Sequence, residues 1–192
     1  MAKQRRGHDR RNSILAAARE VFLKRGYEAA TLDEIIARAG GSRATIYQEF
    51  GDKQGLFAAI VGAVCEEMTL PLQANIGSRR ALLDFGLVYM HALMRPENIG
   101  LYRLVIAEGH HLPALARQVF DTGPEATADS LTRMLSAKLP PAKASRAARA
   151  FLEMVKGDHH TRALFGIDQP TTNEIDRSVR IAVDIFCDGL GL

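Results

Sequence analysis

Tryptophan, paired cysteines and long apolar runs are all missing from this 192-residue chain. No apolar stretch approaches the 18 or more residues that suggest a membrane-spanning helix, so we expect no such span. Cys65 and Cys187 lie far apart, each inside a helical pattern, which favours small buried side chains over a disulfide or a redox pair. The basic first residues lead into no apolar segment, so we expect no secretory signal and a cytoplasmic protein.

The chain also lacks the short motifs of common enzymes. It contains no GxSxG, no HExxH and no phosphate-binding glycine loop. Histidines occur as the adjacent pairs His110-His111 and His159-His160, but neighbours on a helix point about 100° apart and cannot share a metal as an i, i+4 pair does. We therefore predict no catalytic residues, no metal and no cofactor, although a loop conformation would escape this geometric objection.

What is present is the composition of a folded, slightly basic protein. Hydrophobic residues make up 47% and charged residues 24%, and the length suits one large domain or two small ones. The net charge of +3 is uneven, because residues 1–55 hold 11 Lys and Arg against 7 Asp and Glu. The positive charge therefore belongs to the N-terminal part, as a phosphate-facing surface requires.

Residues 31–53, TLDEIIARAGGSRATIYQEFGDK, predict two short helices joined by a tight turn. Thr31 and Glu34 have the spacing of a capping box at the start of the first helix. Gly40 and Gly41 end that helix, since glycine reaches the left-handed conformation at little steric cost. A second helix is predicted directly after the turn.

The second helix has an apolar side and a hydrogen-bonding side. Ser42 is its expected cap, and Ile46 and Phe50, four residues apart, face inward. The residues that fan across the outer side are Arg43, Ala44, Thr45, Tyr47 and Gln48.

This stretch resembles the helix-turn-helix of the tetracycline-repressor (TetR) family of bacterial transcriptional regulators. The shared residues are Thr31, the pair Ala39-Gly40, the run Thr45-Ile46-Tyr47, Phe50 and Lys53. The resemblance implies a three-helix DNA-binding head on residues 1–55, followed by a helical ligand-binding and dimerisation domain on residues 56–192. It implies as partners an operator in double-stranded DNA, a second copy of the chain and a small-molecule effector.

Residue chemistry suggests a role for each position on the DNA-facing side. Arginine suits guanine and glutamine suits adenine, so base edges are assigned to Arg43, Thr45 and Gln48. Phosphates are assigned to Thr31, Tyr47 and Lys53, two of which lie at helix N-termini. Ser42 and Ala44 complete the predicted surface.

Three residues depart from the family pattern. Ile36 stands where alanine is usual and Gly41 where a valine-like residue is usual, and we expect the larger and smaller side chains to compensate. Glu49 lies on the flank of the recognition helix, where it would either accept a hydrogen bond from a cytosine or turn toward Arg43 or Arg38. These departures leave the list of base contacts open.

Around the motif, the head is completed by a basic arm and two helices. Residues 1–11 carry five Lys and Arg without an apolar anchor, so we expect an arm that is mobile in the absence of DNA. An amphipathic helix is predicted over 12–25, with Tyr27 plugging the three-helix core, and a long helix over 53–70.

The rest of the chain predicts an all-α fold. The polar segment 73–78 is the expected loop and domain boundary, and no convincing alternating β pattern follows it. Proline positions and apolar periodicity predict further helices at 79–94, 97–109, 112–120, 124–138, 142–157 and 172–190.

Helix 172–190 is apolar on more than one side, with Ile181 and Ile185 well off the main stripe. Such a helix needs a second packing partner, either within the monomer or in another subunit. In the TetR family the last two long helices form a four-helix bundle with those of a second copy, which implies a homodimer through 142–157 and 172–190. The residues expected from the first of these are Ala147, Ala148, Phe151, Leu152 and Val155.

The ligand domain offers candidate residues but names no effector. The segment from Leu101 to Leu115 resembles one branch of TetR-type regulators. Glu108 is either paired with a base such as Arg103 or an orienting group at a cavity edge. A Met and aromatic stripe is often ordinary core, and the pocket candidates are Phe85, Tyr89, Met90, Met94, Tyr102, Ile106 and Glu108.

Together these features predict a ligand-responsive repressor that binds a palindromic operator as a homodimer. The other interpretation is an all-α small-molecule carrier or enzyme with an incidental helix-turn-helix. Whether the protein represses or activates depends on where its operator lies, which the amino-acid sequence does not specify.

Overall fold

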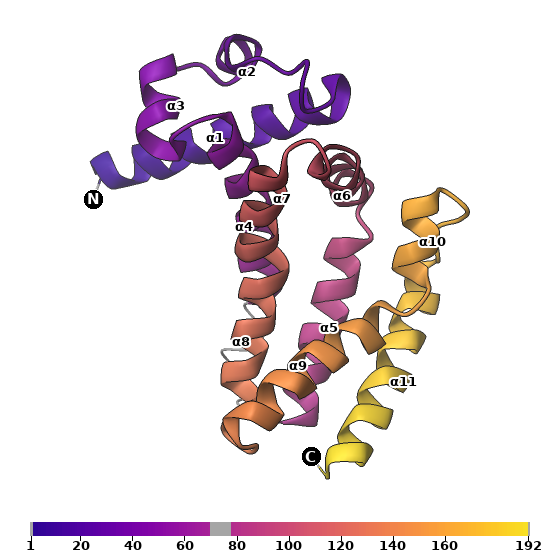
Figure 1. Ribbon diagram of the computed structural model, residues 1–192. Helices are drawn as coiled ribbons and strands as arrows, with labels where there is room; N and C mark the ends of the chain where they lie inside the picture. The colour runs from indigo at the N-terminus through magenta and orange to yellow at the C-terminus, as the bar shows by residue number, and fades with distance from the viewer. Residues whose placement is uncertain (1, 70–77, 192) are drawn as a thin grey trace. The chain divides into compact units, whose positions relative to one another are not determined.

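The computed structural model describes residues 2–69 and 78–191, with side chains from residue 9 onward in the first helix. Every regular element within these residues is helical, which confirms the predicted all-α fold (Figure 1). No helix among them is long and apolar enough to cross a membrane. Most of the expected loop and boundary at 73–78 lies outside the described residues; Ser78 is described and caps the next helix.

The helices follow one another with short connections. Their bounds are α1 Ala2–Arg25, α2 Leu32–Ala39, α3 Arg43–Phe50, α4 Lys53–Thr69, α5 Arg79–Leu93, α6 Pro96–Gly109, α7 Pro113–Phe120, the π-turn η2 Asp121–Glu125, α8 Ala126–Leu135, α9 Pro141–Lys156, α10 His159–Phe165 and α11 Thr172–Leu190. The chain packs as two compact units, residues 1–63 with 100–123 and residues 64–99 with 124–192. The functional division at residues 55 and 56 stays a prediction, since packing units do not show which part binds DNA or ligand.

Three aromatic rings form the centre of the first unit. Phe57 of α4 is fully buried and meets Phe22 and Tyr27 edge-on, with ring centroids 5.1 and 5.5 Å away. Phe22 and Tyr27 stack on each other at 5.6 Å. The prediction that Tyr27 is buried in the core of the head is therefore confirmed. Ile35 of α2 and Ile46 of α3 belong to the same buried cluster as these rings.

The second unit is built around α11 and α9. α11 packs on α5 and on α9, and α9 also packs on α8. The buried stripe of α11 includes Ile175, Val179 and Phe186, and Phe151 of α9 meets Phe186 with ring centroids 4.8 Å apart. Burial of these apolar faces is the main stabilising contribution to this unit.

Several helix predictions differ from the structure. α1 begins at Ala2, so residues 2–11 of the expected mobile arm are helical here. The helix predicted over 124–138 is replaced by η2 and α8, with Pro124 inside the wider π-turn instead of at a helix end. α10 was not predicted, because seven residues are too few to show a clear apolar period.

Candidate nucleic-acid interface

Side-chain caps and left-handed glycines shape the turn between α2 and α3. Thr31 accepts a hydrogen bond from the Glu34 N–H at 3.2 Å, and Ser42 caps α3 in the same way. Gly40 and Gly41 have φ of 72° and 112°, a region that side chains with a Cβ rarely enter. The predicted start of each helix and the predicted glycine turn between them are therefore confirmed.

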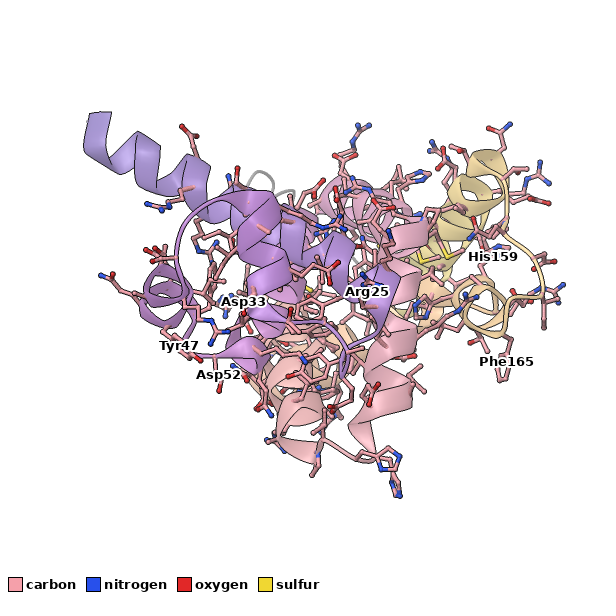
Figure 2. The ribbon with its side chains drawn as sticks, turned by 90° about the horizontal axis from the view of Figure 1, so that it is seen from above. Arg25, Asp33, Tyr47, Asp52, His159 and Phe165 are labelled. Carbon is pink, nitrogen blue, oxygen red and sulfur yellow. The ribbon has the colours of Figure 1, made fainter. Side chains whose placement is uncertain are left out.

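The outer side of α3 presents the predicted DNA-binding groups to solvent. Tyr47 is 53% exposed, and it is labelled on the head in Figure 2. Ile46 points inward and is buried, while Phe50 is half-buried. Of the predicted set, Thr31, Ser42, Arg43, Ala44, Tyr47 and Gln48 are exposed, and Thr45 and Lys53 are half-buried.

Arg43 is held by an acid from the preceding helix. Its Nε donates to Oδ1 of Asp33 at 2.7 Å, and its Nη2 donates to Oδ2 of the same carboxylate. This hydrogen-bonded cation keeps the pKa of Asp33 below its usual range and raises that of Arg43. Asp33 was not among the predicted site residues, because a separation of ten positions across a turn follows no helical period.

Lys53 is turned inward in this structure. Its Nζ donates to the backbone carbonyl of Glu28 at 3.0 Å and lies 4.6 Å from the centre of the Tyr27 ring. Burial lowers the pKa of Lys53, whereas burial and the nearby acids Asp52, Glu28 and Glu108 raise that of Tyr27 to about 12. A phosphate would compete with these two contacts for the Lys53 ammonium, and the predicted phosphate contact stays a prediction.

Two local expectations about the acids of the motif are changed by the structure. The capping box at Thr31 is only half made, because the Glu34 carboxylate accepts from Arg25 and Arg38 instead of reaching back to the cap. The structure also pairs the two arginines proposed as partners of Glu49 with other acids, Arg43 with Asp33 and Arg38 with Glu34 and Glu20.

The side chain of Arg10, from α1, lies beside Gly41. A Cβ built on Gly41 would lie 3.2 Å from Nη2 of Arg10, and its three nearest atoms all belong to that guanidinium. Arg11 lies over the Phe50 ring at 5.5 Å. Both arginines were expected in a mobile arm. Ile36 was expected to compensate for the small side chain at Gly41, but the nearest atoms there belong to Arg10.

The predicted ligand-contacting residues fall in different packing units. Phe85, Tyr89, Met90 and Met94 are buried in the core of the second unit, where Phe85 stacks on Tyr89 with centroids 5.4 Å apart. Tyr102, Ile106 and Glu108 belong to the first unit, and Ile106 is 60% exposed. These four residues are therefore part of the hydrophobic core. Their contact with a ligand stays a prediction.

The two histidine pairs have different surroundings. The rings of His110 and His111 meet edge-on with centroids 5.7 Å apart. His160 is buried, and burial lowers its pKa to about 4, so it is neutral near pH 7. Across residues 2–69 and 78–191, no group of three or more His, Cys, Asp or Glu side chains could hold a metal ion.

Two family profiles match separate segments of the chain. The profile described as bacterial regulatory proteins of the tetR family matches residues 14–60, which include α2 and α3. The profile described as the AefR-like transcriptional repressor C-terminal domain matches residues 80–189.

Curated relatives match over part of the chain. The transcriptional activator FasR of Mycolicibacterium smegmatis is 49% identical over 53 residues, 28% of this chain and 24% of that protein. The repressor BepR of Brucella suis is 48% identical over 52 residues, 27% of this chain and 25% of that protein. The aligned part is thus about a quarter of the length of these relatives.

Solved structures match over nearly the whole chain. A TetR-family regulator from Mesorhizobium loti is 25% identical with a TM-score of 0.77, covering 96% of this chain and 98% of that one. The flavonoid-responsive regulator FrrA is 28% identical with a TM-score of 0.67, covering 94% and 96%. The all-α fold is therefore shared with solved TetR-family regulators.

Proposed function

Because the chain belongs to the TetR family of bacterial regulatory proteins, we propose that it is a ligand-responsive repressor that binds a palindromic operator as a homodimer. Transcriptional regulation through DNA binding is the shared role of the family and of the named relatives. A cytoplasmic location goes with this proposal, since the protein must reach DNA.

The observation that carries the proposal is the outer face of α3. α3 is capped by Ser42 and packs on the core through the buried Ile46. Its opposite side exposes Arg43, Tyr47 and Gln48 to solvent. A helix of this kind can enter the major groove, where base pairs display distinct patterns of donors and acceptors. Side chains that donate or accept hydrogen bonds on an exposed helix face can pair with these base edges.

An exposed apolar ridge on α11 supports a dimer. Ile181 and Ile185 are 53% and 59% exposed, on a helix whose other side is buried in the second unit. Such a ridge is best covered by an equivalent surface, as two-fold symmetric dimers require. The apolar α9 residues expected at the interface, Ala147, Ala148, Phe151, Leu152 and Val155, are instead buried within the single chain. Any contribution of α9 to a dimer would therefore come from its opposite, exposed side.

Response to a small molecule is supported by the similarity to FrrA, a regulator described as flavonoid-responsive. An effector that binds better to a dimer with badly spaced heads would draw the population off DNA. We expect that a compound from a screen that includes flavonoids will both raise the melting temperature and release operator DNA in a fluorescence assay. A compound that stabilises the protein and leaves DNA binding unchanged is not the effector.

Repression is proposed on the similarity to BepR and to the AefR-like profile, both named as repressors, although FasR is named an activator. An operator overlapping the promoter of the regulated gene is the arrangement that repression requires. A carrier or enzyme with an incidental helix-turn-helix would show no affinity for any DNA at low salt, which a mobility-shift titration detects directly.

Base recognition is tested by two substitutions on the DNA-facing side. We expect Gln48→Ala to relax base preference at one position per half-site, by roughly 1–3 kcal/mol of discrimination. Lys53→Ala should instead weaken binding to all sequences and reduce the salt slope by about one. Binding-site selection and salt titrations measure both effects.

Gln118→Ala is the matched control, because Gln118 is also exposed and lies in the same packing unit. It should leave both the consensus and the salt slope unchanged. Thermal melts of all three variants separate lost contacts from lost folding, which matters most for Lys53 because of its inward contacts. An unchanged consensus for Gln48→Ala would contradict the base assignment.

A further inference from the structure

One polar contact crosses the face that the proposed function turns toward DNA. Asp33 in the first turn of α2 holds Arg43, the first residue of α3 (Figure 2 labels Asp33). Both side chains are about two-thirds exposed. The pair therefore lies on the surface beside the outer residues of the recognition helix and is not part of the core below it.

The geometry of the pair leaves one edge of the arginine available to a ligand. A guanidinium has two edges that can each donate two parallel hydrogen bonds. Asp33 takes the side edge, made by Nε and Nη2. It does not take the terminal edge, made by Nη1 and the second hydrogen of Nη2, and a terminal edge of this kind matches O6 and N7 of guanine in the major groove.

From this geometry we infer that Asp33 is a positioning residue for base recognition. It fixes the rotation of the Arg43 guanidinium so that the terminal edge is directed outward to a guanine. The inference rests on the proposed function, because it needs α3 to enter the major groove. It assigns a role in sequence specificity to a residue of α2 that has no place among the expected base contacts.

Charge gives the pair a second consequence. An arginine without an acid partner at this surface would bind any phosphate, which adds affinity without specificity. The Asp33 carboxylate balances that charge and holds the cation in one orientation. Arg43 would then contribute more to the choice of sequence than to general attraction for DNA.

A purely structural role does not account for the pair well. Ion pairs between exposed side chains add little to stability. α2 and α3 are already held by the buried Ile35 and Ile46 and by the caps at Thr31 and Ser42. What the pair adds is the orientation of one side chain.

The test is Asp33→Asn in the full chain, which removes the charge and keeps the shape. Arg43→Ala first identifies the base position that Arg43 reads, by binding-site selection. At that same position Asp33→Asn should reduce discrimination against the wrong base by roughly 5- to 100-fold. Its affinity for random duplex DNA should hold or rise, with a salt slope steeper by about one.

Glu49→Gln is the matched control, because Glu49 is another exposed acid and lies on α3 itself. It removes the same charge but leaves the Asp33 contact with Arg43 in place, so it should preserve discrimination at the Arg43 position. Asp33→Glu, which keeps the carboxylate, should restore part of the discrimination lost in Asp33→Asn. Thermal melts should show each variant within a few degrees of the parent.

The outcomes separate this inference from the proposed function. If the parent protein binds no DNA, the proposed function is wrong. If Arg43→Ala reduces discrimination but Asp33→Asn does not, the positioning role of Asp33 is overturned while the function stands. A rise in operator affinity of Asp33→Asn with intact discrimination would also overturn it, because Asp33 would then only compete with DNA for Arg43.

Discussion

Replacing Ile181 and Ile185 together by glutamate is expected to convert the proposed dimer to a monomer and to weaken binding to the proposed operator by roughly 10²- to 10⁴-fold. The two side chains are four residues apart on α11, so they form one ridge, and both are more than half exposed in the single chain. Four glutamates brought together across a two-fold axis would be desolvated beside like charges, which opposes association.

The loss of DNA affinity follows from the loss of linkage between the two heads. In a dimer, binding of one half-site raises the effective concentration of the second head at the other half-site. A monomer has only the contacts of one head. Sedimentation equilibrium measures the first effect and titration of a full operator and a half-site measures the second.

Phe120→Glu is the control for the added charge. Phe120 is 48% exposed and lies in α7, outside the two helices proposed for the dimer. It should leave the molecular mass in solution unchanged. If the α11 double variant remained a dimer at micromolar concentration, the association surface would have to lie elsewhere.

Phe57→Ala is expected to destabilise the DNA-binding head by about 3–5 kcal/mol. Phe57 is fully buried and its ring joins those of Phe22 and Tyr27, which come from α1 and from the connection to α2. Removing the ring leaves a cavity that helices already held by caps and turns cannot easily close. DNA binding should fall in parallel, because α3 loses its support.

Phe165→Ala is the matched control. Phe165 is 78% exposed at the end of α10, and Figure 2 shows its side chain extending away from the ribbon. Its loss should change the free energy of unfolding by no more than about 0.5 kcal/mol. Because the chain has two packing units, hydrogen exchange of the α2 and α3 amides is the appropriate readout for the head. A loss below about 1 kcal/mol for Phe57→Ala would contradict the central role of this ring.

Local signals were sufficient for most of the helix-turn-helix. The caps Thr31 and Ser42 and the turn at Gly40 and Gly41 were predictable because each acts on backbone groups a few residues away. Tyr27 was predictable as core because it is the one large apolar group in a polar connection. Such inferences need only neighbouring residues and the helical period.

Local signals failed where a feature was short or unusual. The helix period had too few residues to mark α10, and a proline was expected to end a helix where the π-turn accommodates Pro124. The start of α1 was misplaced because the basic residues before Asn12 have no apolar stripe, although the structure continues the helix to Ala2.

The fold class, the position of the helix-turn-helix and the polar side of α3 could all be read from the amino-acid sequence, because they depend on contacts between near neighbours. The sequence did not reveal that Asp33 holds Arg43, that Lys53 binds the Glu28 carbonyl, or that Ile181 remains exposed while α9 buries its apolar face. Each of these contacts depends on how two helices, or a helix and a connection, are placed in space. Pairings across ten or more positions are set by crossing angles and side-chain reach, which no periodicity in the sequence encodes.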